Sequence, residues 1–227
     1  MSFLDGSKAS MARRAGIGRP SRIVAKEGRI RGRRVALVDP GIGAPSAVLT
    51  LEETRLRGYR DFLFLGACGG LALDLRIGDV VLPEAAISEE GTSRLYTRSG
   101  PTFYSDAALL NLLKSTAEGA GLKTLRGLVW TTDAPYRETP AKIRRFRRLG
   151  ATAVDMETSA LFAVARLRRA RVAGLLVVSD LLHSKWKIGW SQKRYEKAER
   201  EARDVLVEAA MTLADDARGA RKGEQIA

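Results

Sequence analysis

The chain has 227 residues, of which 45% are hydrophobic and 29% charged, and its formal net charge is +13. This length suits one large domain with a sizeable core, and the composition excludes an intrinsically disordered chain. No apolar run approaches the roughly 20 residues that span a bilayer, and the N-terminus has no hydrophobic signal region. The single cysteine, Cys68, excludes an intrachain disulfide. We therefore expect a cytoplasmic protein without a membrane partner.

The positive charge has two interpretations. It could serve an anionic partner, either a nucleic acid or a phosphate-bearing substrate, or it could form a solvated, arginine-rich surface. The basic residues are spread over several predicted helices, and no nucleic-acid binding motif accompanies them. The sequence therefore favours the solvated surface, and we expect no nucleic-acid partner.

Predicted strands alternate with predicted helices along the chain. The strands are expected at residues 33–38, 62–65, 78–82, 125–131, 151–154 and 172–178. Helices are expected at residues 46–59, 106–119 (capped by Ser105), 140–149 and 191–218, with one more beginning near Glu157. Glycine-rich loops are expected at residues 39–46 and 66–70, and an irregular segment of strand pieces and loop at residues 84–103. This alternation predicts an α/β sheet with helices on both faces.

The domain organisation follows from the same pattern. Residues 1–27 are polar and basic, and we expect a leader that is poorly ordered or packs on another subunit. A single domain is expected over residues 28–218, followed by a frayed tail at residues 219–227.

Carboxylates follow two apolar runs of the predicted sheet, the pair Asp155 and Glu157 after the first run and Asp180, next to Ser179, after the second. Open α/β sheets bind ligands at the carboxyl ends of their strands, so we expect the active site there. Glu157 could complement a helix dipole or accept hydrogen bonds from sugar hydroxyls. Asp180 could cap a helix or act as a general acid.

The sequence shows no pattern typical of a nucleotide-cofactor or metal site. The glycine-rich loops match neither the Walker A spacing nor the dinucleotide fingerprint, and each could be a simple tight turn. His183 is the only histidine and has no Cys or His partners at ligand spacing, so we predict no metal site. Trp186 and Trp190 could belong to the core or to a lid.

Five segments, in order, resemble the purine nucleoside phosphorylase/uridine phosphorylase superfamily, which includes the methylthioadenosine/S-adenosylhomocysteine nucleosidases. They are GIGAPS (41–46), GACGGLALDLRIGDVV (66–81), TTDAPY (131–136), AVDMETSALFAVA (153–165) and LLVVSD (175–180). The resemblance implies a three-layer αβα sandwich around a distorted mixed central sheet. It also implies cleavage of an N-glycosidic bond with phosphate as co-substrate, no cofactor, and homo-oligomers, dimer-based and possibly hexameric, whose neighbouring subunits complete the sites.

The resemblance also implies roles for single residues. Glu157 would accept the 2′ and 3′ hydroxyls of the ribose, and Met156 would pack on the sugar. Asp180 would be the acid that protonates N7 of a purine. The pyrimidine branch commonly has Asn-Arg at this position, so an aspartate there favours a purine base. Further substrate contacts and one phosphate ligand from a neighbouring subunit are implied as well. The substrate contacts would be Gly43, Ala67, Cys68, Gly69 and Tyr136, and the phosphate ligand would be Arg22.

The sequence departs from this family at the phosphate site. Phosphorylases usually have an arginine and a Ser or Thr where this chain has Phe64 and Ala67, and neither of these side chains can bind phosphate. The usual first strand with its Gly-Asp-Pro…Arg loop has no visible counterpart. Three hypotheses follow: a nucleoside phosphorylase, a hydrolytic nucleosidase, and a nucleoside-binding homologue without turnover.

Overall fold

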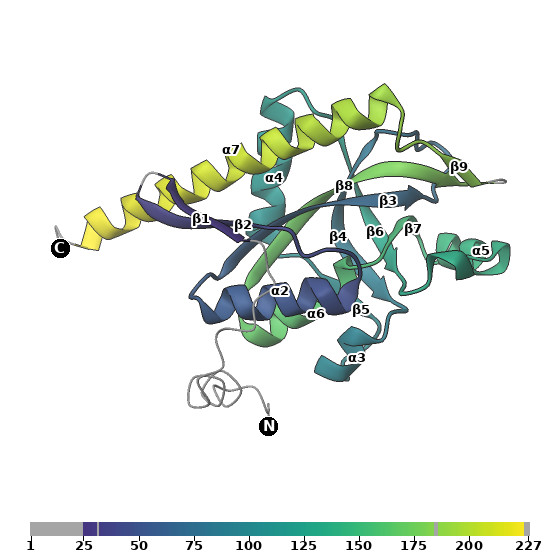
Figure 1. Ribbon diagram of the computed structural model, residues 1–227, viewed down its shortest axis with the longest axis horizontal. Coiled ribbons are helices and arrows are strands. Elements are labelled where there is room, and N and C mark those ends of the chain that lie inside the picture. Colours follow the sequence, from purple (N-terminus) through teal and green to yellow (C-terminus); the bar gives the residue numbers. More distant parts are fainter. Residues whose placement is uncertain (1–24, 31, 184–185, 225–227) are drawn as a thin grey trace.

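The computed structural model describes residues 25–30, 32–183 and 186–224 (Figure 1). The larger sheet of this part has strand order β5-β4-β6-β7-β3-β8-β9, and β4 also pairs with β8. Its strands are β3 (Asp61–Gly70), β4 (Val80–Ser88), β5 (Thr102–Tyr104), β6 (Thr124–Thr131), β7 (Ala151–Asp155), β8 (Arg171–Leu182) and β9 (Trp186–Ile188). The β3/β8, β4/β6 and β6/β7 pairs are parallel and the other pairs antiparallel, which makes the sheet mixed.

Helices cover both faces of this sheet. They are α2 (Ala44–Leu56), α3 (Thr92–Tyr96), α4 (Ala107–Gly119), η1 (Pro135–Arg137), α5 (Pro140–Arg148), α6 (Thr158–Arg168) and α7 (Lys193–Glu224). Figure 1 shows α4 and α7 on one side of the sheet and α2 and α6 on the other. The described residues therefore form the three-layer sandwich around a mixed sheet that the sequence predicts.

Strand β8 connects the two cores of the molecule because its side chains alternate between the faces. Leu175 and Val177 pack into the core under α4 and α7, whereas Leu176 and Val178 pack into the core with α2 and α6. All four side chains are buried. Burial on both faces explains why this strand is a continuous apolar run rather than an alternating one.

The glycine-rich segment at residues 66–70 is not a loop, as the sequence suggested, but the second half of β3. It pairs with β8, with a register shift between Cys68 and Gly69. A Cβ at Gly69 would collide with Leu182 and press on Val154. The glycine is thus required where three strands approach closely, and not for a turn.

Several other boundaries differ from the expectation. Strand β8 does not end before Ser179 but continues through Leu182, so Asp180 lies inside a strand. The segment expected to be irregular contains the end of β4, helix α3 and β5. Helix α4 is capped by Asp106, whose Oδ1 accepts from Leu109 N at 3.0 Å, and not by Ser105.

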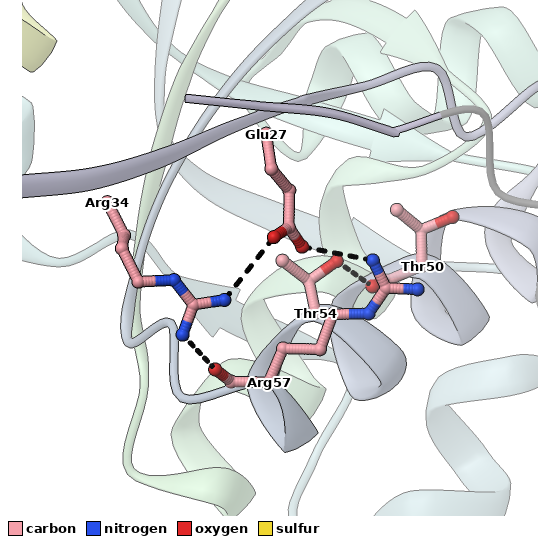
Figure 2. A network of polar contacts seen from close by, with 5 residues as sticks. All are labelled: Glu27, Arg34, Thr50, Thr54 and Arg57. Carbon is pink, nitrogen blue, oxygen red and sulfur yellow. Dashed lines mark hydrogen bonds and ion pairs between the residues drawn. The ribbon is translucent and has the colours of Figure 1, made fainter. Parts of the chain in front are cut away.

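The separate hairpin of β1 (Ala25–Ile30) and β2 (Arg33–Val38) is attached to the end of α2. Figure 2 shows the Glu27 carboxylate between Arg34, at 3.4 Å, and Arg57, at 3.1 Å. The Arg34 guanidinium also donates to the Arg57 carbonyl at 3.3 Å. These groups are partly exposed, so the contacts orient the hairpin more than they stabilise the fold.

The first strand and the last helix can be compared with the expected domain limits. Strand β1 begins at Ala25 and α7 continues to Glu224. The division into residues 1–27, 28–218 and 219–227 stays a prediction. In the part of the chain that the structure describes, none of the helices has the length and hydropathy to cross a membrane.

Candidate active site

The carboxyl ends of several strands meet at one end of the sheet. Thr131 at the end of β6 pairs with Asp155 at the end of β7. Gly69 near the end of β3 pairs with Val154 on one side and with Asp180 on the other. The segment with Asp155 and Glu157 and the segment with Ser179 and Asp180 are therefore brought together around the carboxyl end of β3.

Glu157 is held at the start of α6 by a contact with a distant glycine. It is the N-cap residue, and its Oε1 accepts a hydrogen bond from the backbone N–H of Gly43 at 2.6 Å. Gly43 has a φ of +94°, a backbone conformation that glycine adopts without strain. Burial, together with the charge of Asp155, raises the pKa of Glu157 to about 7, although the Gly43 hydrogen bond opposes this rise. The structure thus brings the predicted substrate contacts Gly43 and Glu157 together.

Asp155 fixes the turn that carries Glu157. Its Oδ1 accepts from Thr131 Oγ1 at 2.7 Å, and its Oδ2 accepts from the N–H of Thr158 at 2.7 Å and of Glu157 at 3.1 Å. The carboxyl is buried, and this burial raises its pKa although the hydrogen bonds oppose the change. With its lone pairs taken by the protein, Asp155 positions Glu157 rather than binding a ligand.

Asp180 carries two hydrogen bonds of its own. Its Oδ1 accepts from Ser179 Oγ and its Oδ2 from Trp186 Nε1, both at 2.7 Å. Ser179 Oγ also lies 3.2 Å from the Cys68 carbonyl. The side chain of Trp186 is not a core residue, since it is 57% exposed. Trp186 therefore covers the predicted acid from the solvent side.

The thiol of Cys68 shows how close the acidic groups are to one another. Burial raises its pKa well above the usual range, and the charges of Asp155 and Asp180 raise it further. Because one thiol experiences both carboxylates, Asp155 and Asp180 lie near the end of β3. The assignment of Cys68 and Gly69 to the base-binding segment stays a prediction.

Glu138 is a carboxyl that the sequence analysis did not assign. It lies in the loop after β6, half-buried, and makes no side-chain hydrogen bond or ion pair with the described residues. Burial, together with the charges of Asp180 and Glu89, raises the pKa of Glu138 to about 7, although the charge of Lys142 opposes this rise. Lys142 is already bound to Glu89 at 2.9 Å. No local pattern reveals this group, because its proximity to Asp180 depends on the fold.

The raised pKa of Glu138 gives a pH prediction for stability. The folded state holds the Glu138 proton more tightly than the unfolded chain does. Glu138 therefore does not lower the free energy of unfolding below pH 4.5, lowers it increasingly as pH rises from 4.5, and has its full destabilising effect above about 7. Glu138→Gln removes this cost and should raise the melting temperature by roughly 2–4 °C at pH 8, but not at pH 4.5. Thermal unfolding at both pH values measures it, with exposed Glu196→Gln as control. An equal change at both pH values would contradict the prediction.

For the remaining predicted residues the structure gives only exposure and packing. Met156 is half-buried beside Glu157, Ala67 is exposed, and the Tyr136 side chain is 93% exposed in η1. The Phe64 ring packs edge-to-face on Phe162, with a centroid separation of 6.3 Å. Phe64 is therefore a packing residue and leaves no cation at the position usual for phosphate. Arg22 lies outside the described residues.

A search for metal ligands among the described residues finds no group of three or more His, Cys, Asp or Glu side chains that could hold an ion. His183 Nε2 lies 2.8 Å from the Ala72 carbonyl and is satisfied by that contact. The polar groups of the site are therefore hydrogen-bonding carboxyls and backbone amides.

The comparison with known families assigns this αβα sandwich to a class of proteins. Residues 15–213 match the phosphorylase superfamily, so the chain belongs to this family. The structure also resembles the crystal structure of purine nucleoside phosphorylase from Toxoplasma gondii in complex with immucillin-H. The TM-score is 0.79 at 19% identity, over 88% of this chain and 82% of the other.

Curated relatives lie in the purine branch. A guanosine phosphorylase of Halorubrum lacusprofundi is 31% identical over 151 residues, which are 66% of this chain and 63% of the relative. A DeoD-type purine nucleoside phosphorylase of Bacillus cereus is 30% identical over 158 residues, which are 67% of this chain and 66% of the relative. The aligned part thus spans slightly less than two thirds of each relative's length.

Proposed function

We propose that this chain cleaves the N-glycosidic bond of purine nucleosides by phosphorolysis. The observation that carries the proposal is that Glu157 and Asp180 reach the same end of the sheet, the first held by Gly43 and the second by Trp186. Relatives named guanosine phosphorylase and purine nucleoside phosphorylase support it. In this reaction the C1′–N9 bond breaks, a C1′–O bond to phosphate forms, and the bonding electrons leave with the base.

Glu157 anchors the sugar in this proposal. One carboxylate oxygen accepts from Gly43 N–H, and its remaining acceptor capacity faces the hydroxyls of a ribose. Such charge-assisted hydrogen bonds are stronger than neutral ones. They hold the sugar while positive charge develops at C1′, and the carboxylate stabilises that charge.

Asp180 and Glu138 act at the base. The leaving purine gains electron density that a proton on N7 neutralises. Asp180 orients the base through a carboxylate fixed by Ser179 and Trp186, and Glu138, with its pKa of about 7, is a nearby carboxyl that holds a proton at neutral pH. A proton delivered to N7 through this pair converts the base into a neutral leaving group.

The phosphate and the assembly complete the proposal. Phe64 and Ala67 provide no phosphate ligand, so we assign this role to Arg22 of a neighbouring subunit. This assignment requires a homo-oligomer, and we expect a cytoplasmic enzyme that uses phosphate as co-substrate without a cofactor. A phosphate dependence that survives Arg22→Ala unchanged would remove this residue from the mechanism.

The test of the proposed function is release of free base from a panel of purine and pyrimidine nucleosides, with and without phosphate. We expect release from purine nucleosides only in the presence of phosphate, with ribose 1-phosphate as the second product. Release that is indifferent to phosphate would instead establish a hydrolytic nucleosidase, which the side chains of Phe64 and Ala67 favour. Nucleoside binding by calorimetry without any release would indicate a non-catalytic homologue.

A further inference from the structure

A cavity of about 360 Å³ lies beside helix α3, between the end of β4 and β5. Figure 1 shows α3 at the lower edge of the molecule, beyond α2 and α6. The cavity contains none of the residues assigned above to sugar, base or phosphate. Side chains that line it are Ser88, Ser93, Arg94, Thr97, Arg98 and Phe103.

The walls of this cavity are held by backbone contacts. Ser88 N–H donates to the Pro101 carbonyl at 2.7 Å, and β4 and β5 pair from Ile87 with Thr102 onward. On the opposite side, Thr97 N–H donates to the Ser93 carbonyl at 3.0 Å. The first bond and the strand pairing fix β4 beside β5, whereas the other wall consists of α3 and of the loop at residues 97–101 that joins α3 to β5.

Two arginines, Arg94 and Arg98, line this cavity, and neither is paired with a described carboxylate. Neither Arg94 nor Arg98 forms a hydrogen bond or ion pair with another described residue. Arg168, by contrast, is bound to Glu52 at 2.8 Å. The nearest acid in the chain, Glu90, cannot neutralise them, since it is fully buried and engaged elsewhere.

The bonds of Glu90 account for both of its oxygens. Ser88 Oγ and Ser159 Oγ donate to its Oε1 at 2.9 and 3.0 Å, and the backbone N–H of Ser93 donates to its Oε2 at 2.9 Å. Glu90 thus connects Ser88 and Ser93, which line the cavity, to Ser159 of α6. Two guanidinium groups remain for a ligand.

We propose that this cavity binds a phosphate oxyanion, either inorganic phosphate or a phosphate monoester. Each guanidinium presents a planar fork of N–H donors that matches two phosphate oxygens, and two such groups balance a dianion. The Thr97 hydroxyl, which also lines the cavity, is already hydrogen-bonded to Ser99, so the two guanidinium groups carry the proposal. A volume of about 360 Å³ exceeds that of phosphate and leaves room for an ester substituent, with Phe103 as apolar wall.

Equilibrium dialysis with radiolabelled inorganic phosphate tests this site at fixed ionic strength in KCl. Wild-type protein is compared with Arg94→Gln/Arg98→Gln and with a control, Arg144→Gln/Arg148→Gln, which removes two exposed arginines from α5. The first variant should lose one phosphate equivalent or bind it at least about tenfold more weakly, and the control should match wild type. Equal stoichiometry and affinity in all three proteins would overturn the proposal.

Further arms identify the ligand and protect the test against misfolding. Ribose 1-phosphate as competitor distinguishes a monoester site, where it displaces phosphate better than sulfate does, from a site for inorganic phosphate. Arg94→Lys and Arg98→Lys keep the charge, remove the fork and should bind phosphate more weakly; binding like wild type would overturn the forked geometry.

The proposed function is tested separately from the cavity, by measuring the KM for phosphate in the phosphorolysis assay. The Arg94→Gln/Arg98→Gln variant should keep its KM for phosphate, because the cavity is separate from the reaction site. A raised KM together with loss of the sole phosphate equivalent would overturn a separate site. If no nucleoside is cleaved at all, the dialysis result still decides the cavity.

Discussion

Glu157→Ala should lower kcat/KM for purine nucleosides by about 10²–10⁴-fold. The carboxylate is proposed to accept two ribose hydroxyls, and a hydrogen bond to a charged group contributes about 1.5–3 kcal/mol. Two such contacts, strengthened as charge develops at C1′, account for a loss of this size. Steady-state kinetics with guanosine or inosine measure it.

The sugar dependence of this loss makes the prediction specific. A 2′-deoxynucleoside lacks one of the two hydroxyls, so Glu157→Ala should impair it less than the ribonucleoside. Glu157→Gln keeps an acceptor for the Gly43 N–H and should preserve the fold while losing the charge. Exposed Glu196→Ala on α7 serves as control. Turnover unchanged by Glu157→Ala, or an equal loss for both sugars, would refute the assigned role.

The same group sets a pH dependence with a definite sign. Burial raises the pKa of Glu157 to about 7, and only its ionised form accepts both hydroxyls. For wild type, ionisation of Glu157 should therefore increase kcat/KM as pH rises toward about 7, and loss of the Glu138 proton should lower kcat/KM at higher pH. For Glu157→Gln this rise should disappear, because the amide does not titrate.

Most strands were predictable from the sequence because each is a local apolar run between turn signals, whereas β1 and β9 were not predicted. Residues 125–131 and 33–38 correspond closely to β6 and β2 for this reason. The segment at residues 66–70 was interpreted wrongly, because glycine propensity indicates a turn when only neighbouring residues are considered. The approach of β7 and β8 on Gly69 favours the strand, and this contact is not visible in one segment of sequence.

The candidate site was predictable to a similar extent. Glu157 and Asp180 follow apolar runs within contiguous motifs, so their places near the carboxyl ends of β7 and β8 could be inferred, although β8 continues past Asp180 to Leu182. The bond between Trp186 and Asp180 and the proximity of Glu138 to Asp180 could not, because they depend on how β8, β9 and the loop after β6 meet. Contacts of this kind arise from the fold and leave no local pattern.

Asp180→Asn should lower kcat for purine nucleosides by about 10²–10⁴-fold, the usual contribution of a general acid. The substitution keeps the size of the side chain, and its oxygen still accepts from Trp186 Nε1, while its amide N–H₂ donates to Ser179 Oγ with that hydroxyl reversed as acceptor. The fold should therefore survive, which circular dichroism checks. What is lost is the carboxyl that, with Glu138, carries a proton to the base.

A substrate that does not need this proton separates chemistry from structure. 7-Methylguanosine already carries a formal positive charge at the methylated N7, so its base leaves without protonation. Asp180→Asn should therefore cleave 7-methylguanosine at a rate within about tenfold of wild type while guanosine cleavage falls by orders of magnitude. An equal loss for both nucleosides would mean that Asp180 only binds the base, and the proton would then have to come from Glu138, a role that Glu138→Gln tests with the same pair of substrates.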